Sequence, residues 1–173
     1  ELPPVLRLRS AHGATPDTHL LSNGRYTVML TASGSGYSRW GDFGITRWRE
    51  DATRDDWGAY VFLRDAKSGE VWWAGYQPSG AEPDTYQVTF TEDRAEFIRH
   101  DGAVTTMLEV VVSPEDNAEV RRVSVTNADD RPRELELTSY AELVLAPPAA
   151  DAAHPAFSKL FVQTEYLPNV GVI

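Results

Sequence analysis

Apolar and polar residues alternate along most of the chain, which is the pattern of half-buried β-strands. The clearest alternating runs predict strands at residues 25–33, 86–90, 104–112 and 133–145. Shorter runs predict further strands at residues 60–64, 70–74, 95–99, 119–126 and 160–164. Because no window carries a long 3.6-residue apolar repeat, helix is expected only as a turn near residues 51–56 or 149–153.

Two of these runs predict which side chains face the core. In the run 104–112, the predicted inward face holds Val104, Thr106, Leu108, Val110 and Val112. In the run 133–145, the predicted inward face holds Leu135, Leu137, Ala141, Leu143 and Leu145. A strand as long as residues 133–145 exceeds the usual length in a small sandwich, so large and curved sheets are expected.

Turn-forming residues separate the predicted strands. Asn23-Gly24, Ser68-Gly69 and Asp101-Gly102 supply residues that accept positive φ or bond their own backbone. The Ser-Gly-Ser-Gly-Tyr-Ser stretch at 33–38 is expected to be a flexible loop, and residues 149–155 are expected to form another. About ten strands joined by such turns predict an all-β fold of antiparallel sheets packed face to face.

Composition narrows the classes of function. The chain has 173 residues, with 16 basic and 26 acidic ones, for a net charge of −10. This balance argues against nucleic-acid binding, which needs clustered Lys and Arg. The absence of cysteine excludes disulfides, thiolate metal sites and thiol nucleophiles. No run approaches the roughly 18 apolar residues of a membrane-spanning helix.

The termini suggest a fragment. The chain starts at Glu1 rather than at Met and ends on the apolar residues Val172 and Ile173. We therefore expect one substantial domain that is a piece of a larger protein.

Residues 39–58 are the richest in candidate chemistry. They hold Trp40, Trp48 and Trp57, and also the arginines Arg39, Arg47, Arg49 and Arg54. A pyranose has an apolar C–H face that stacks on aromatic rings and a rim of hydroxyls that needs polar partners, so this combination suits a sugar. The alternative is structural: the indoles anchor the core, and the arginines form ion pairs that hold the loops.

Other candidates for chemistry are weaker. Asp51, Asp55 and Asp56 are close enough in sequence to raise glycoside hydrolysis or calcium binding, but they match neither an EF-hand nor a defined acid–base pair. The four histidines are scattered, so no metal site is expected. In the pair Trp72-Trp73, one indole is expected in the core, with the other facing solvent, a partner or a ligand.

Four motifs carry a resemblance to a known family. They lie at residues 21–29 (Leu-Ser-Asn-Gly-Arg-Tyr-Thr-Val-Met), 34–40 (Gly-Ser-Gly-Tyr-Ser-Arg-Trp), 46–51 (Thr-Arg-Trp-Arg-Glu-Asp) and 54–58 (Arg-Asp-Asp-Trp-Gly). In these motifs the chain resembles the N-terminal β-sandwich domain of glycoside hydrolase family 94, formerly glycosyltransferase family 36. That family includes cellobiose and chitobiose phosphorylases and the phosphorylase-like part of cyclic β-1,2-glucan synthases. Residues 113–116, 141–143 and 154–165 are most similar to the synthases.

The resemblance implies an antiparallel super-sandwich of two large curved sheets, truncated relative to the family. It implies a sandwich domain at residues 19–173, preceded by an extension or linker at residues 1–18. In the family, an (α/α)₆ barrel follows and carries the general acid and the phosphate-binding residues. No catalytic residue is therefore expected on this chain, which is expected to be inactive alone. No cofactor is implied; inorganic phosphate is the co-substrate of the whole inverting enzyme.

The resemblance also implies roles and partners. Tyr37, Arg39 and Trp40 are expected to contact glucan or the barrel. Arg47, Trp48, Arg49 and Trp57 are expected to brace them. The implied partners are a β-glucan or glucosyl oligosaccharide, the missing barrel and a second copy in a homodimer. Nucleic acid is not among the expected partners, because of the net negative charge. The implied location is the cytoplasmic side of a bacterial inner-membrane enzyme.

Three functions remain open from the sequence. The first is a non-catalytic domain that supports the barrel active site of a cyclic β-1,2-glucan synthase or β-glucan phosphorylase-like enzyme and helps to bind glucan. The second is a stand-alone carbohydrate-binding module. The third is a purely structural dimerisation domain. Sugar binding by the isolated chain would distinguish the second, because only that alternative predicts useful affinity without the barrel.

Overall fold

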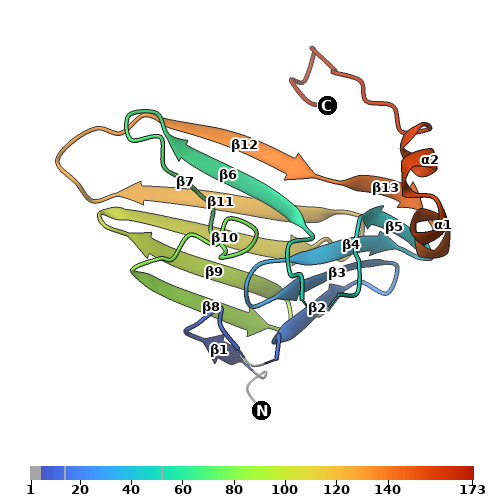
Figure 1. Cartoon of the computed structure of the whole chain (residues 1–173), viewed down its shortest axis with the longest axis horizontal. Coiled ribbons are helices and arrows are strands. Elements are labelled where there is room, and N and C mark those ends of the chain that lie inside the picture. The colour runs from blue at the N-terminus through green and yellow to red at the C-terminus, as the bar shows by residue number, and fades with distance from the viewer. Residues whose placement is uncertain (1–4, 14, 52) are drawn as a thin grey trace.

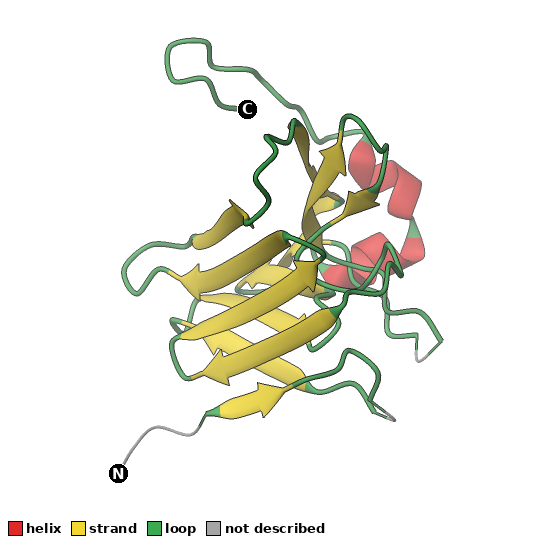
Figure 2. Cartoon of the chain, turned by 90° about the vertical axis from the view of Figure 1, so that its left-hand side faces the viewer, coloured by secondary structure: helices red, strands yellow, loops and turns green. Residues whose placement is uncertain are grey.

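The computed structural model describes residues 5–13, 15–51 and 53–173, and these residues form antiparallel sheets with two short helices (Figure 1). The predicted all-β fold is confirmed. The helices α1 (Pro148–Ala153) and α2 (Pro155–Lys159) lie together on one side of the sheets (Figure 2). No helix among the described residues is long and apolar enough to cross a membrane.

The first sheet has five strands in the order β1-β8-β9-β10-β11. Their bounds are β1 (Leu6–Leu8), β8 (Thr85–Thr91), β9 (Arg94–Asp101), β10 (Val104–Val112) and β11 (Glu119–Asn127). Strand β1 lies within the stretch that the sequence assigned to an extension or linker, and it pairs with β8. Strand β11 is the outer strand on the other side of this sheet and pairs with β10 alone.

The other strands form two further sheets. One has the order β13-β5-β4-β3-β2, with β13 (Leu143–Ala146), β5 (Phe43–Thr46), β4 (Gly36–Trp40), β3 (Tyr26–Thr31) and β2 (Thr18–Ser22). The other has the order β12-β6-β7, with β12 (Leu135–Ala141), β6 (Ala59–Asp65) and β7 (Val71–Trp72). Every ladder between named strands is antiparallel.

The core lies between the inward faces of the two five-stranded sheets. Tyr86, Val88 and Phe90 of β8 are buried, as their alternation predicts. On β10 the predicted face is also correct, since Val104, Thr106, Leu108 and Val110 are buried and Val112 is partly buried. These strands share one buried cluster with Tyr26, Val28 and Leu30 of β3. Removal of this apolar surface from water is the main force that holds the sheets together.

Trp73 fills the place where the layers meet. Its side chain is 1% exposed, and the ring of Tyr60 packs edge-on against it at a centroid distance of 4.8 Å. A Cβ at Gly34 or Gly75 would lie 2.5 Å or 2.3 Å from the indole, so only glycine leaves room for the ring at either position. Trp73 therefore fixes the β3–β4 turn against the segment that follows β7.

The expectation for the pair Trp72-Trp73 is wrong, because both indoles are buried. Trp72 is 7% exposed and donates a hydrogen bond from its indole nitrogen to the hydroxyl of Thr106, at 2.9 Å. Thr106 lies on β10, so this bond joins the three-stranded sheet to the first five-stranded sheet. Alternation puts the two rings on opposite sides of the chain, as predicted. Both sides face the interior, because Trp73 belongs to the main core cluster and Trp72 to a smaller cluster with Leu63 and Val104.

The stretch 33–38 is not the flexible loop that its glycines suggested. Only its first part is a turn, and residues from Gly36 onward form β4. The hydroxyls of Ser33 and Ser35 donate to the carboxylate of Asp55, and Ser35 is fully buried. The glycines are there because neighbouring atoms crowd the backbone, not because the segment moves.

Two predictions near the C-terminus are also wrong. The run 133–145 is interrupted at Glu142: β12 pairs with β6, whereas β13 pairs with β5. Leu145 has a positive φ of 51°, and in β13 Val144 is buried while Leu143 and Leu145 are exposed. Leu137 and Ala141, on the predicted inward face of β12, are exposed as well. The strand expected at residues 160–164 is absent, because α2 ends at Lys159 and a turn follows it.

The helix predictions have different outcomes. The turn expected at residues 149–153 is present as α1, which replaces most of the loop expected at 149–155. Residues 51 and 53–56 are not helical, and residue 52 lies outside the described residues. Asp51 instead accepts a hydrogen bond from the backbone of Thr53, at 2.8 Å.

Helix α1 starts at Pro148, and a proline favours the first turn of a helix because an N–H at that position would have no partner within the helix.

We predict that Gly36→Ala lowers the free energy of unfolding by about 3 kcal/mol or more. A Cβ at Gly36 would lie 1.9 Å from the carbonyl oxygen of Met29, so the β3–β4 ladder would have to separate. Gly41→Ala is the control, because Gly41 also has positive φ but has no atom within 4 Å of the added carbon. It should cost only about 1–2 kcal/mol. Urea unfolding followed by tryptophan fluorescence measures both, and equal losses would contradict the crowding argument.

Candidate functional site

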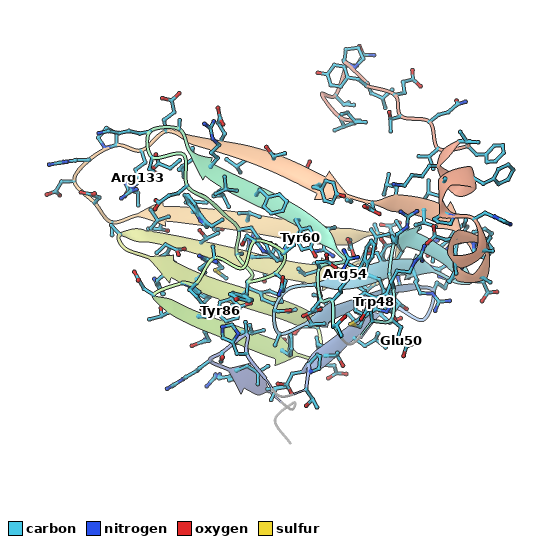
Figure 3. All side chains as sticks on the ribbon, in the orientation of Figure 1. Trp48, Glu50, Arg54, Tyr60, Tyr86 and Arg133 are labelled. Carbon is cyan, nitrogen blue, oxygen red and sulfur yellow. The ribbon has the colours of Figure 1, made fainter. Side chains whose placement is uncertain are left out.

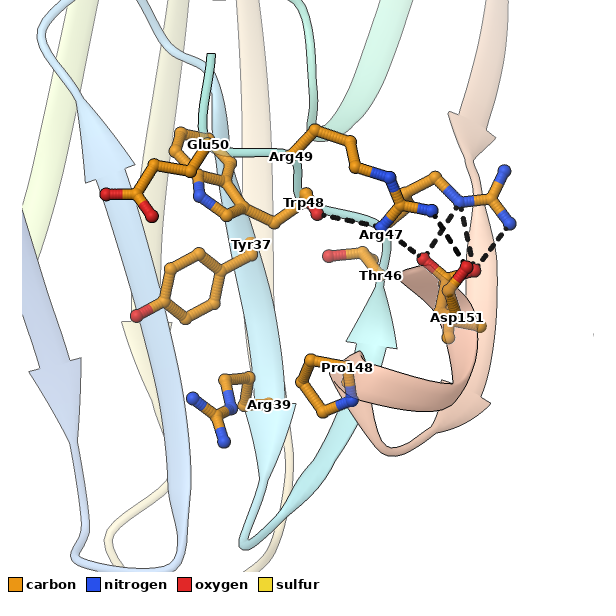
Figure 4. Close-up of a pocket in the computed structure, with 11 residues that line it drawn as sticks. Tyr37, Arg39, Thr46, Arg47, Trp48, Arg49, Glu50, Pro148 and Asp151 are labelled. Carbon is orange, nitrogen blue, oxygen red and sulfur yellow. Dashed lines mark hydrogen bonds and ion pairs between the residues drawn. The ribbon is translucent and has the colours of Figure 1, made fainter. Parts of the chain in front are cut away.

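A pocket of about 290 Å³ lies where β4, β5 and the residues after β5 meet α1 (Figure 4). Tyr37 and Arg39 alternate along β4 and so share one face, opposite the buried Ser38. Gly44 pairs directly with Arg39 and adds no side chain, which leaves space over the sheet. The remaining lining residues are Thr46, Arg47, Trp48, Arg49, Glu50, Val144, Pro148 and Asp151.

One wall of the pocket is a buried ion network. Arg47 donates from Nη2 to Oδ1 of Asp151 at 2.8 Å and from Nη1 to Oε2 of Glu142 at 2.8 Å. Arg49 pairs with the other oxygen of Asp151 at 2.5 Å. Arg47 is 8% exposed and Asp151 is 2% exposed, so little water competes for these bonds. The network ties β5 to α1 and to the break between β12 and β13.

The network also sets the charge state of its members. Burial raises the pKa of Asp151, but the hydrogen bonds and charges of Arg47 and Arg49 outweigh it, so the net pKa lies below the ordinary value. The hydrogen bond to Asp151 in turn raises the pKa of Arg47. Asp151 is therefore an anion at neutral pH, and its two arginines are saturated by protein groups. Arg47 and Arg49 are held in place by partners within the chain.

Arg39 differs from these two arginines. Within the described part of the chain it has no carboxylate partner, and its buried Nε has no hydrogen-bond acceptor. Buried polar groups in folded proteins are nearly always paired. The guanidinium of Arg39 therefore retains unused donors at the pocket.

An aromatic pair lines another side of the pocket. The rings of Tyr37 and Trp48 meet edge to face, with centroids 5.7 Å apart and planes at 62°. Glu50 lies beside them and is exposed. The pocket thus combines apolar ring surface, free guanidinium donors and a carboxylate acceptor. Chemically, this arrangement can hold a ligand with an apolar ring face and a rim of hydroxyls.

The structure brings five of the seven predicted site residues to this pocket: Tyr37, Arg39, Arg47, Trp48 and Arg49. Trp40 lies outside it, on the β4–β5 hairpin, where its ring stacks on Phe43 with centroids 6.3 Å apart. Trp57 lines a different hollow, of about 310 Å³. The roles of all seven residues in binding stay a prediction.

Asp151 and Glu142 were not among the predicted site residues. Asp151 is the only charged residue in the apolar run 147–157, and that isolation was a usable signal of a buried partner. Glu142 was assigned to the polar side of a continuous strand, whereas it occupies the break between β12 and β13. Both acids come from the C-terminal part of the chain, so their pairing with Arg47 joins residues about a hundred positions apart.

The aspartates at 51, 55 and 56 do not form a catalytic or metal-binding cluster. Asp51 accepts from Thr53, Asp55 accepts from Ser33 and Ser35, and Asp56 pairs with Arg54 at 2.7 Å. Each carboxylate therefore binds a different set of partners within the chain. Throughout residues 5–13, 15–51 and 53–173, no group of three or more His, Cys, Asp or Glu residues is arranged to hold a metal ion.

Comparisons with known proteins agree with the fold and the motifs. Residues 3–173 match the family described as "Glycosyl hydrolase 94, supersandwich domain". The chain is similar to the cyclic beta-(1,2)-glucan synthase NdvB of Rhizobium meliloti, with 46% identity over 91% of this chain and 6% of that protein. It is also similar to the N,N'-diacetylchitobiose phosphorylase of Vibrio furnissii, with 29% identity over 91% of this chain and 20% of that protein.

We predict that Asp151→Asn lowers the free energy of unfolding at pH 7 by about 2–4 kcal/mol, because it removes the anion that pairs with the buried Arg47 and the partly buried Arg49. The folded pKa of Asp151 lies below its unfolded value, so this contribution is present above about pH 4 and is lost as the pH falls through the folded pKa. The difference between wild type and variant should therefore shrink under acid conditions.

The control for this prediction is Glu136→Gln. Glu136 pairs with Arg64 at 2.7 Å, but both side chains are at least half exposed, so the loss should stay below about 1 kcal/mol. Chemical denaturation between pH 3 and pH 8 measures the two variants side by side. A pH-independent loss for Asp151→Asn would show that packing, not charge, makes the contribution.

Proposed function

The chain belongs to the glycosyl hydrolase 94 supersandwich-domain family, and from this premise we propose that it is a non-catalytic domain that supports a barrel active site and helps to bind glucan. The chain spans 6% of the length of the glucan synthase and 20% of the chitobiose phosphorylase that it matches. The whole protein would be a cyclic β-1,2-glucan synthase or a related β-glucan phosphorylase. Inorganic phosphate would be its co-substrate, and it would act at the cytoplasmic side of a bacterial inner membrane.

The observation that carries the proposal is the composition of the Tyr37–Trp48 pocket. Its two aromatic rings can contact the C–H face of a glucosyl unit, and the unused donors of Arg39 can bind its hydroxyls. The Arg47–Asp151–Arg49 network holds the wall behind them, so few side chains must be ordered when a ligand binds. A preformed site of this kind suits a domain that positions substrate for another domain.

The carboxylates of the pocket support a non-catalytic role. Glycosidic bond cleavage needs an acid positioned to protonate the leaving oxygen. Of the two acids that line the pocket, Asp151 is neutralised by two arginines and Glu50 has no acidic partner across the space. The family resemblance puts the general acid in the barrel, which fits this arrangement.

The two alternatives make different predictions for the isolated chain. A stand-alone carbohydrate-binding module would bind glucan as tightly alone as in a larger protein, whereas a supporting domain would bind it weakly without the barrel. A purely structural dimerisation domain would not bind it at all. The unused donors of Arg39 favour a ligand-binding role over the purely structural one.

We predict that Arg39→Ala, in the complete enzyme that contains this chain, raises KM for linear β-1,2-glucan by about tenfold and changes kcat less than about twofold. The reason is that the guanidinium contacts substrate equally before and during the reaction. Arg64→Ala is the matched control, since Arg64 is an exposed arginine on β6 away from the pocket. An unchanged KM for Arg39→Ala would refute the binding role.

A homodimer is also part of the proposal. Strands β11 and β12 are the outer strands of their sheets, and the apolar side chains of Val120 and Leu137 are exposed on them. Unpaired strand edges with apolar side chains are sites of association.

We predict that the chain dimerises through these strands and that light scattering gives twice the mass of 19.2 kDa. Leu137→Lys should shift the protein to the monomer, because it places a charge on the apolar face of β12. Lys159→Leu is a control at a site away from both strands. A monomeric wild type at all concentrations would overturn this part of the proposal.

A further inference from the structure

We propose that the hollow lined by Trp57, Tyr60, Phe62 and Tyr140 is a second saccharide-binding site, separate from the Tyr37–Trp48 pocket, that takes one pyranose unit of a neutral glucan chain. The site rests on its own geometry, while the choice of glucan as the ligand rests on the proposed function. We call it the Trp57 hollow.

The Trp57 hollow is built mainly from two stretches far apart in the sequence, residues 54–62 and residues 140–142. Tyr60 and Phe62 belong to β6, Tyr140 belongs to β12, and residues 54–58 form the loop that leads into β6. Figure 3 labels Arg54 of this loop and Tyr60. Its volume is about 310 Å³. Aromatic rings from each segment line this hollow, as in a typical sugar-binding site.

Unpaired polar atoms are concentrated here. Among the described residues, six buried side-chain polar atoms have no hydrogen-bond partner. Three of them, Oδ1 of Asp56, Nε1 of Trp57 and the hydroxyl of Tyr60, belong to residues that line this hollow. These groups are already shielded from solvent, and such groups are rare in folded proteins. Once these side chains turn toward the hollow, a ligand that brings both donors and acceptors would pair with them, whereas an apolar ligand would not.

The local charge selects a neutral ligand. Asp56 and Glu142 supply two carboxylates, and Arg54, the cation among the lining residues, already pairs with Asp56 at 2.7 Å. Arg54 also covers Trp57, 5.4 Å from the ring centroid. Burial and the nearby Asp55 and Asp56 raise the pKa of Tyr60, so its hydroxyl remains a donor at neutral pH. A phosphate would find no free cation among the lining residues, because Arg54 pairs with Asp56 and Glu142 pairs with Arg47, whereas a sugar hydroxyl would find acceptors and donors.

The outer rim of the hollow is held by the same network that supports the first pocket. The hydroxyl of Tyr140 donates to Glu142 at 3.1 Å, and Glu142 accepts from Arg47 at 2.8 Å. Tyr140 is 49% exposed, yet this contact orients its ring at the edge of the hollow. Glu142 lines the Trp57 hollow and Arg47 lines the Tyr37–Trp48 pocket, so one ion pair joins the two sites. Such an arrangement suits a polymer, since one glucan chain has units for both sites.

The five tryptophans provide the test, because each indole N–H gives its own signal in a ¹H–¹⁵N spectrum. Trp48 reports on the first pocket and Trp57 on the hollow, while the buried Trp72, which lines neither site, is the internal control. Titration of the 173-residue chain with a linear β-1,2-gluco-oligosaccharide should shift the Trp57 signal saturably and leave the Trp72 signal unmoved. Weak binding suffices, since spectra detect dissociation constants in the millimolar range.

Variants separate the two sites. Tyr140→Ala should weaken the affinity reported by Trp57 at least about fivefold and the affinity reported by Trp48 much less. Tyr166→Ala is the matched control, because Tyr166 is an exposed tyrosine that lines neither site. Asp56→Asn is a second variant that keeps the shape of the side chain, and it should also weaken the response of Trp57.

Each outcome is decisive. A shift of Trp48 with no shift of Trp57 overturns this inference and leaves the proposed function standing, with the hollow holding water alone. A shift of Trp57 with no shift of Trp48 supports the hollow and counts against the first pocket. No shift of either signal overturns the hollow as a glucan site, and the KM of Arg39→Ala then judges the proposed function by itself.

Discussion

The indole of Trp73 is the constraint on which the layers depend. It sits where the β3–β4 turn, the segment after β7 and strand β6 come together, and it leaves no room for a Cβ at Gly34 or Gly75. Because a protein interior is packed like a crystal, a ring of this size fixes the separation of the elements around it. The position of β4 follows from that separation, and the aromatic and guanidinium side chains of the first pocket follow from the position of β4.

The position of helix α1 depends on buried ion pairs. The sheets alone do not fix α1, which is a helix of six residues and would not be stable by itself. Asp151 fixes it by binding Arg47 and Arg49, and Arg47 extends the contact to Glu142. A buried ion pair of this kind adds little net stability but strongly penalises any arrangement that separates its members. The network therefore defines one geometry for the wall that the two proposed sugar sites share.

Sequence reasoning succeeded where one local rule governed the structure. The alternation of β8 and β10 identified their buried residues, because each strand has one face on the core and keeps its register. It failed where residues far away in the sequence determine the local conformation. Glycines in the stretch 33–38 resemble a loop locally, and only the approach of Met29 and Trp73 shows that they are packed. The break at Glu142 is likewise invisible in the alternation, because it depends on β5 and β6 lying in different sheets. Most of the pocket residues lie in one aromatic and arginine-rich segment, but their buried acids lie about a hundred residues away.

Consecutive strands β12 and β13 complete two different sheets, and this determines the order in which the fold can assemble. Residues 135–141 supply the partner of β6, and residues 143–146 supply the outer partner of β5. During synthesis, β5 and β6 are made long before either of these partner strands. Leu63 of β6, for example, pairs with Leu137, which is more than seventy residues later in the chain. Contacts so distant in sequence are slow to form, because the chain loses the entropy of closing a long loop before the strand pairing contributes stability. Until then the nascent chain carries open strands, so this interval of synthesis is the period in which misassembly competes with folding.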